Sequence, residues 1–367
     1  MKCINCGKST PRVAQGLGYC ADCIRSNPSI AREIVERVHA KSRAEFNLPP
    51  HPPNTPAGIN CRICMNECRI PDGGRGYCGL RLNKSGKLIH LGGTPKVGVV
   101  SWYFDPLPTN CVADWVCPAG SDSGYPEFSY RRGQEYGYKN LAVFYGACSF
   151  NCLFCQNWHY RGDIERGRRM SAAKLADCVD DKTACICYFG GDPTPQLPHA
   201  IATSRIALEQ AYGRILRICW ETNGSMSLPL LKQMARLSMK SGGCIKFDLK
   251  AWSKELHIAL TGVSNERTLE NFRYLATLRF QRQNPPFLIA STLLVPGYID
   301  VEEVRSLAKF IASLGQDIPY ALLAFHPHFY MSDLPTTSRQ QALACLKTAE
   351  EQGLTNVRLG NLHLLME

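Results

Sequence analysis

The stretch that decides the fold is Gly146-Ala-Cys-Ser-Phe-Asn-Cys-Leu-Phe-Cys-Gln-Asn157. It carries Cys148, Cys152 and Cys155 in the spacing C-x3-C-x2-C, directly after a short apolar run. Three thiolates on one tight loop can bind three irons of a [4Fe–4S] cluster and leave the fourth iron open to another ligand. The alternative is a zinc site with His159 as the fourth ligand, because structural zinc takes four protein ligands.

Apolar runs alternate with helical patterns from about residue 140 onward. Strands are expected at residues 141–145, 184–189, 215–220, 245–249, 287–294 and 321–325. Helices are expected at residues 171–179, 199–212, 228–240, 265–280, 301–313 and 337–351. Repeated strand–helix units favour an α/β fold with a parallel sheet, closed into a full or partial barrel or left open. In either case the chemistry is expected at the C-terminal ends of the strands.

Glycines and polar residues follow the expected strands at the ends where we expect the chemistry. They are Gly190, Gly191 and Asp192 after the second strand, Glu221, Thr222 and Asn223 after the third, Asp248 and Lys250 after the fourth, and His326 after the sixth. Two glycines let the backbone come close to a ligand, and the two-residue period of a strand puts Asp248 and Lys250 on one side. Without a ligand, the same residues would form a glycine–proline turn, salt bridges at the rim and a surface histidine.

The cysteine loop resembles the signature of the radical S-adenosylmethionine (SAM) superfamily, C-x3-C-x-aromatic-C, with Phe154 at the aromatic position. The resemblance implies that Cys148, Cys152 and Cys155 bind a [4Fe–4S] cluster, that its free iron binds SAM, and that Phe154 lies near the adenine. It also implies an electron donor such as flavodoxin or ferredoxin. Reduction would cleave SAM to methionine and a 5′-deoxyadenosyl radical, which abstracts hydrogen from the substrate.

The strand-end motifs are similar to those of the pyruvate formate-lyase activating enzyme branch of this superfamily. The resemblance implies a partial (β/α)6 barrel, with the Gly190-Gly191-Asp192 segment along the methionine part of SAM. It implies that the polar residues after the third and fourth strands contact the SAM carboxylate and help to hold a monovalent cation. Glu221 stands where the branch has aspartate, which changes the geometry of such a cation site. His326 would contact SAM or substrate.

A second cysteine set precedes the barrel segment. It consists of Cys61, Cys64, Cys68 and Cys78, and its spacing suits either zinc or an auxiliary iron–sulfur cluster, with zinc slightly preferred. The stretch resembles AmmeMemoRadiSam-type radical SAM proteins, although Met65 stands where proline is usual. Cys111 and Cys117 lie downstream as a spare pair or as thiols that face the substrate.

The N-terminal segment has zinc-ribbon spacing, C-x2-C-x13-C-x2-C, formed by Cys3, Cys6, Cys20 and Cys23. Zinc is the expected metal, because four thiolates close the site and stabilise a module too small for a core of its own. We expect a zinc-ribbon-like module and helix at residues 1–47, a proline-rich linker at 48–57, a cysteine-rich extension at 58–137 and the barrel at 138–367.

Composition narrows the class of protein. The chain has 367 residues, 45% apolar and 20% charged, which excludes disordered and fibrous classes. Its 19 cysteines occur without an apolar leader segment, so we expect metal sites in a cytoplasmic protein rather than disulfides. The sequence has no run of 18 apolar residues, so we expect no membrane-spanning helix. Six further thiols are expected to be buried and inert: Cys178, Cys185, Cys187, Cys219, Cys244 and Cys345.

Two functions compete with an activating-enzyme-like radical SAM enzyme that acts on a protein, a peptide or a small molecule. The net charge of +11 is compatible with an RNA-modifying radical SAM enzyme. A non-catalytic, metal-dependent nucleic-acid-binding or scaffold protein is the second alternative. A purely structural cluster would need a fourth ligand nearby, and the strand-end motifs would then have no role. The sequence therefore favours the enzyme, with nucleic acid not preferred as a partner.

Overall fold

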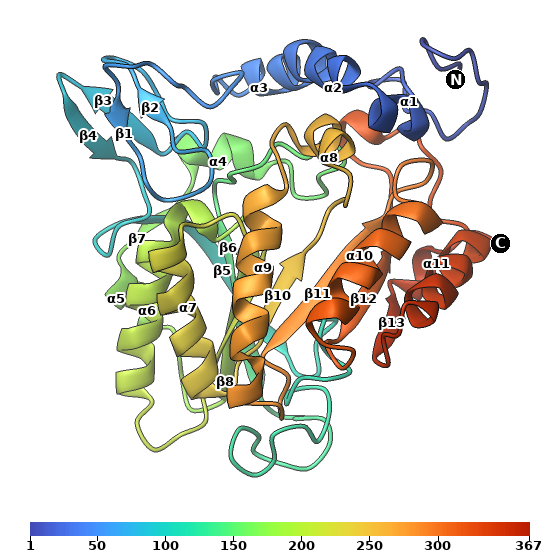
Figure 1. Ribbon diagram of the computed structural model, residues 1–367. Coiled ribbons are helices and arrows are strands. Elements are labelled where there is room, and N and C mark those ends of the chain that lie inside the picture. Colours follow the sequence, from blue (N-terminus) through green and yellow to red (C-terminus); the bar gives the residue numbers. More distant parts are fainter.

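The computed structural model describes residues 1–367, and its centre is a nine-stranded sheet in the order β13-β12-β11-β10-β9-β8-β6-β5-β7. Six neighbouring strands are parallel: β6 (Lys139–Tyr145), β8 (Thr183–Gly190), β9 (Arg217–Thr222), β10 (Ile245–Asp248), β11 (Leu288–Leu294) and β12 (Tyr320–Ala324). Each overlaps a strand predicted from the sequence. The sheet curves into a partial barrel, so the predicted α/β architecture is confirmed (Figure 1).

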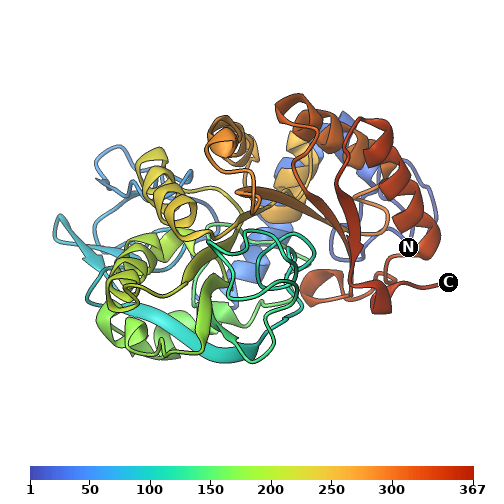
Figure 2. The same ribbon diagram turned by 90° about the horizontal axis from the view of Figure 1, so that it is seen from below.

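Helices cover the outer face of this sheet (Figures 1 and 2). They are α5 (Ala172–Ala176), α6 (Leu197–Gln210), α7 (Leu228–Ser241), α9 (Glu266–Leu278), α10 (Val301–Leu314) and α11 (Arg339–Glu351). Two further helices, α4 (Tyr160–Arg166) and α8 (Lys254–Thr261), lie at the upper end of the molecule in Figure 1. The sequence predicted the six helices on the outer face but not α4 and α8. Helix α10 begins where the Asp300 carboxylate accepts the N–H groups of Glu302 and Glu303. No helix has the length and apolar character needed to cross a membrane.

The sheet is wider than the segment expected to form it. Strand β5 (Gly98–Pro106) pairs antiparallel with β6 from Val100 opposite Tyr145 to Pro106 opposite Lys139. The short strand β7 (Arg169–Met170) lies beyond β5, and β13 (Val357–Gly360) adds a parallel strand beside β12. Residues 98–106, placed in the cysteine-rich extension by the sequence prediction, thus belong to the barrel sheet.

The N-terminal segment lies across the C-terminal ends of the strands (Figure 1). It contains α1 (Ala21–Ser26), α2 (Pro28–Ile34), a π-helical turn (Val35–His39) and α3 (Ala40–Ala44). The Arg25 guanidinium forms ion pairs with Asp300 and Glu303 at 2.9 and 3.0 Å. Val13, Ala14 and Leu17 are buried in the main hydrophobic core. This segment therefore packs on the barrel rather than standing apart from it.

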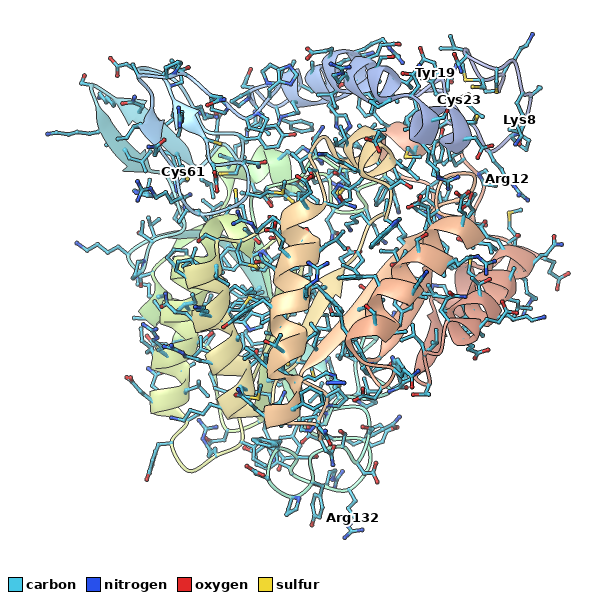
Figure 3. All side chains as sticks on the ribbon, viewed as in Figure 1. Lys8, Arg12, Tyr19, Cys23, Cys61 and Arg132 are labelled. Carbon is cyan, nitrogen blue, oxygen red and sulfur yellow. The ribbon has the colours of Figure 1, made fainter.

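Two small hairpins form the rest of the upper surface. They are β1 (Ile59–Asn60) with β2 (Arg69–Ile70), and β3 (Arg81–Lys84) with β4 (Lys87–His90). Cys61, beside β1, lies at the opposite end of this surface from Cys23 (Figure 3).

A long loop at residues 107–137 closes the other end of the barrel. It contains no helix or strand. Seen from below, it lies across the N-terminal ends of the strands (Figure 2). A fully buried ion pair fastens it, because Glu135 of the loop binds the guanidinium of Arg217 on β9. The Tyr130 hydroxyl adds a hydrogen bond to the carbonyl of Ile215 at 2.9 Å.

Candidate active site

The three cysteines of the loop between β6 and α4 line one cavity of about 660 Å³. Cys148 Sγ accepts hydrogen bonds from the backbone N–H of Phe150 at 3.3 Å and from Asn223 Nδ2 at 3.6 Å. Burial raises the pKa of Cys152 to about 12, and the nearby Lys250 ammonium acts in the opposite direction. Cys152 is therefore protonated without a metal, and the donors around Cys148 favour a metal-bound thiolate.

A hydrogen-bond network from the N-terminal helices holds this loop in place. Asn151 Nδ2 donates to His39 Nδ1 at 2.9 Å and to Ser42 Oγ at 2.8 Å. Its carbonyl oxygen accepts from Arg161 Nη2 at 3.1 Å. Cys152, the residue after Asn151, is thereby fixed to a helix more than 100 residues earlier in the chain.

The end of β8 passes directly beneath the cysteine loop. A Cβ atom on Gly191 would lie 2.3 Å from the carbonyl oxygen of Ala147, and Gly190 has φ of +97°. Only glycine permits this approach. The next residue, Asp192, is buried, and its carboxylate accepts the N–H groups of Asn223 at 2.7 Å and Thr194 at 2.8 Å. Asp192 thus joins the ends of β8 and β9.

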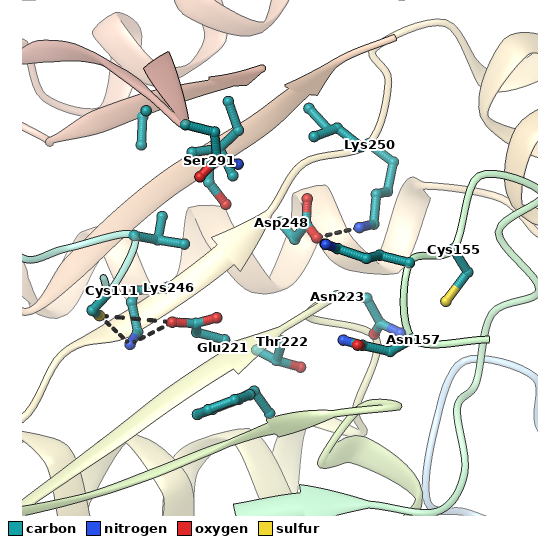
Figure 4. Close-up of a pocket in the computed structure, with 18 of the residues that line it drawn as sticks. Cys111, Cys155, Asn157, Glu221, Thr222, Asn223, Lys246, Asp248, Lys250 and Ser291 are labelled. Atoms are coloured by element: carbon teal, nitrogen blue, oxygen red, sulfur yellow. Dashed lines mark hydrogen bonds and ion pairs between the residues drawn. The ribbon is translucent and has the colours of Figure 1, made fainter. Parts of the chain in front are cut away.

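Two lysines neutralise the acidic residues in the cavity (Figure 4). The Lys250 ammonium forms an ion pair with Asp248. Lys246 Nζ lies 2.9 Å from Glu221 Oε1 and also donates to Cys111 Sγ at 3.1 Å. The two carboxylates predicted to help hold a monovalent cation are therefore already paired with lysine ammonium groups.

The cavity brings together twelve of the thirteen residues predicted to bind the cluster or SAM. They are Cys148, Cys152, Phe154, Cys155, Gly190, Gly191, Asp192, Glu221, Thr222, Asn223, Asp248 and Lys250. His326 does not line the cavity and is exposed beyond the end of β12. Strand β12 ends at Ala324, two residues before His326, so the strand does not direct this side chain into the cavity.

The sequence prediction missed three groups of lining residues. Lys246 lies two positions before Asp248 on the same face of β10, so the strand period could have identified it. Trp115 and its neighbours come from the loop at the other end of the barrel, and residues 358–364 come from β13 and the segment after it. An ion pair of 3.3 Å between Asp114 and Arg358 joins these two distant segments. No local sequence pattern predicts this ion pair, because its two residues are far apart in the chain.

Residues 142–311 match the sequence profile of the radical SAM superfamily. This stretch of the chain is a radical SAM domain. The chain is 26% identical over 310 residues to an uncharacterized protein of Methanocaldococcus jannaschii, covering 83% of this chain and 81% of that protein. It is 25% identical over 193 residues to pyruvate formate-lyase 1-activating enzyme of Escherichia coli, covering 50% and 73%. It is 34% identical over 139 residues to isethionate sulfite-lyase activating enzyme of Desulfovibrio desulfuricans, covering 37% and 40%.

This radical SAM enzyme also carries a compact thiol site at its N-terminus. The Sγ atoms of Cys3, Cys6, Cys20 and Cys23 all lie within 4.8 Å of one another. Two of the Sγ–Sγ distances are 3.8 Å. A tetrahedral zinc ion with Zn–S bonds of about 2.3 Å requires sulfur atoms about 3.8 Å apart. Burial opposes ionisation of Cys3, but the N–H groups of Cys6 and Cys20 lower its pKa to about 6. The four thiols are arranged to bind one metal ion.

The second cysteine set lies against the loop that carries Cys148, Cys152 and Cys155. The hairpin of β1 and β2 joins two of these cysteines, because the N–H of Cys61 donates to the carbonyl of Cys68 at 2.8 Å. Asn66 Nδ2 then donates to the carbonyl of Ser149, the residue after Cys148, at 2.8 Å. The four Sγ atoms are not gathered as closely as those of the N-terminal site. Burial raises the pKa of Cys68 to about 12, and the charge of Cys78 adds to this effect.

Proposed function

We propose that this enzyme binds a [4Fe–4S] cluster through Cys148, Cys152 and Cys155 and uses it to cleave SAM and abstract hydrogen from a protein substrate. The observation that carries the proposal is the single cavity in which the three thiols meet the ends of β8, β9 and β10. Such a cluster, when reduced, supplies the electron that splits SAM into methionine and the 5′-deoxyadenosyl radical.

The donors in the cavity fit both the cluster and SAM. Three thiolates satisfy three irons and leave one iron for a ligand that the protein does not provide. Lys250 brings a positive charge to 5.6 Å from the Phe154 ring, a position suited to the carboxylate of SAM beside its adenine. Gly190 and Gly191 leave backbone carbonyls accessible to the amino group of SAM. Closure by the loop at residues 107–137 limits the access of water to a reactive radical.

A protein is the substrate class that we favour. Two relatives are named as activating enzymes of lyases, which makes a partner enzyme the simplest substrate to propose here. Flavodoxin or ferredoxin would supply the electron. The compartment would be the cytoplasm, where thiols stay reduced.

We further propose zinc at Cys3, Cys6, Cys20 and Cys23, because the sulfur spacing suits a single tetrahedral ion. The set formed by Cys61, Cys64, Cys68 and Cys78 is proposed as a second closed metal site, of zinc or of an auxiliary iron–sulfur cluster. Four thiolates leave no open position for SAM in either case.

The test is anaerobic reconstitution followed by reduction with dithionite and quantification of 5′-deoxyadenosine. Single changes of Cys148, Cys152 or Cys155 to alanine should abolish its formation. Cys178→Ala is the matched control, because Cys178 lies outside the cavity and bonds only the carbonyl of Lys174. Retained SAM cleavage in all three single variants would contradict the cluster assignment.

A further inference from the structure

A second cavity, of about 380 Å³, lies between the barrel strands and the loop at residues 107–137, and cysteines dominate its wall. Six thiols line it: Cys111, Cys117, Cys185, Cys187, Cys219 and Cys244. The sequence predicted four of them to be inert, and three of those four, Cys185, Cys187 and Cys244, are indeed buried. They nevertheless face an open space, which joins the SAM cavity at Glu221 and Lys246.

The strand register explains why these thiols converge. Cys187 on β8 lies directly opposite Cys219 on β9. Trp220 on β9 pairs with Ile245 on β10, so Cys219 is opposite Cys244. Neighbouring strands are about 4.8 Å apart. The result is a row of three thiols across three strands, all on the inner face of the barrel.

Four of the six thiols form one set around the lower part of the cavity. Cys117 comes from the loop, and it shares a small apolar cluster with Cys185 and Cys244. Cys219 is opposite Cys244 in the register of β9 and β10, and it lines the same cavity as Cys117 and Cys185. The remaining two thiols, Cys111 and Cys187, accept hydrogen bonds from Lys246 Nζ, each at 3.1 Å.

A buried cation without a counter-ion lies beside this set. Arg282 is 9% exposed, and its guanidinium bonds only the carbonyls of Ser238 and Gly243. No carboxylate lies within ion-pair distance of it, its guanidinium stacks near the Phe128 and Phe287 rings, and its Nε atom has no hydrogen-bond partner. A buried charge is costly unless an opposite charge compensates it. Ionised thiols at Cys244 and Cys219 would stabilise the charged form of Arg282, in addition to the more distant carboxylate of Glu127.

We propose that Cys117, Cys185, Cys219 and Cys244 bind a second iron–sulfur cluster inside the barrel, distinct from the SAM-binding cluster and from the two cysteine sets at the upper surface. Thiolates select zinc, copper(I) or iron–sulfur clusters. Four thiols lose their protons on binding, and the resulting negative charge compensates Arg282.

The spacing of the thiols favours a polynuclear cluster over a single ion. The N-terminal four are gathered at the 3.8 Å separation that one zinc ion requires, whereas the four cavity thiols are not. They come from separate strands and a loop, which sets their spacing by the distance between strands. In a [4Fe–4S] cluster each thiolate binds a different iron, so the wider spacing suits that cluster type.

The test measures metal rather than activity. The full chain with Cys148, Cys152 and Cys155 all changed to alanine is reconstituted without oxygen, which removes the SAM-binding cluster from the count. Adding Cys219→Ser and Cys244→Ser should then lower iron and acid-labile sulfide by about four atoms each per chain, as expected for a [4Fe–4S] cluster. The matched control adds Cys178→Ser and Cys345→Ser instead and should leave both counts unchanged.

Two further measurements keep the result interpretable. Circular dichroism and the melting temperature must show that the serine variant is folded, and the single variant Cys117→Ser, on the loop, provides a second test that leaves the strands intact. Unchanged iron in both folded variants would overturn the proposal, as would a loss of zinc alone or a disulfide among these thiols. SAM cleavage by the protein with Cys148, Cys152 and Cys155 intact is a separate readout, so failure of one proposal leaves the other standing.

Discussion

Gly191 shows how one missing side chain shapes the site. Its Cβ would lie 2.3 Å from the Ala147 carbonyl oxygen and 2.7 Å from that of Tyr145, both backbone atoms that cannot rotate away. We therefore expect Gly191→Ala to displace the loop that carries Cys148, Cys152 and Cys155. The free energy of unfolding should fall by about 1–3 kcal/mol, and the cluster content after reconstitution should decrease. Urea unfolding and iron analysis measure the two effects.

Gly162, in helix α4, is the matched control for that change. A Cβ atom there would meet nothing within 4 Å. Gly162→Ala should raise the free energy of unfolding by about 0.5–1 kcal/mol, because alanine loses less conformational entropy in a helix. Equal destabilisation by the two alanines would show that contact with the Ala147 carbonyl does not decide the role of Gly191.

Substitution of Lys250 tests whether this residue contributes to SAM binding or to the stability of the fold. Its ammonium contacts only the Asp248 carboxylate within the cavity, and a charged hydrogen bond to a ligand contributes about 1.5–3 kcal/mol. Lys250→Ala should weaken SAM binding roughly ten- to a hundredfold, measured by calorimetry on the reconstituted protein. Lys254→Ala, which breaks an exposed ion pair with Glu266, should leave SAM affinity unchanged. A large loss of melting temperature with normal SAM affinity in Lys250→Ala would favour a purely structural ion pair.

At the scale of elements, the sequence predicted what local patterns encode. The six parallel strands have apolar runs bounded by turn residues, and their order along the chain is their order in the sheet. Strand β5 was missed because it lies among cysteine and glycine signals that indicate a metal-binding extension. Strand β13 is short and only half-buried, so its pattern is weak. The loop at residues 107–137 has no periodicity, and its place across the barrel depends on the distant Arg217.

The helices at the N-terminus also act through tertiary contacts that the sequence did not reveal. Asn151 bonds His39 and Ser42, which fall within the segment predicted to be a separate module. Asn151→Ala leaves His39 Nδ1 and the Nε and Nη2 atoms of Arg161 without their buried hydrogen bonds, so the free energy of unfolding should fall by about 1–3 kcal/mol. Gln210→Ala, which removes one exposed bond to Asp177, is the control and should change it by less than about 0.5 kcal/mol. Urea unfolding of the metal-free chain measures both.

At the scale of the whole molecule, the sequence predicted which residues line the site. It did not predict the cavities that the fold forms between them. Twelve of the predicted residues line one cavity because the ends of parallel strands meet at one edge of the sheet. The thiol-lined cavity needed the register of three strands and the position of a loop, neither of which the residue spacing contains. The compactness of the chain has the same origin, since segments far apart in sequence share one core.

That shared core makes the whole protein sensitive to acid through three buried histidines. Burial lowers the pKa of His39, His199 and His257 to about 4 each, from an ordinary value of 6.5. Below pH 6.5 the unfolded chain takes up a proton at each site, whereas the folded chain does so only near pH 4. The free energy of unfolding therefore falls as the pH drops through this window, by about 3 kcal/mol per histidine.

His199 provides the test, because its ring is remote from the proposed metal sites. Its Nδ1 atom accepts from the Tyr145 hydroxyl at 2.9 Å, and Nε2 donates to the Met170 carbonyl at 3.1 Å. His199→Gln retains one donor and one acceptor but cannot be protonated. The variant should be less stable than the wild type at pH 7, and this deficit should shrink by about 2–3 kcal/mol at pH 4.5. Urea unfolding of both metal-free proteins at the two pH values gives the difference. A deficit of the same size at both would show that His199 does not contribute to the acid sensitivity, and the loss of stability would then have to arise from His39, His257 or the carboxylates.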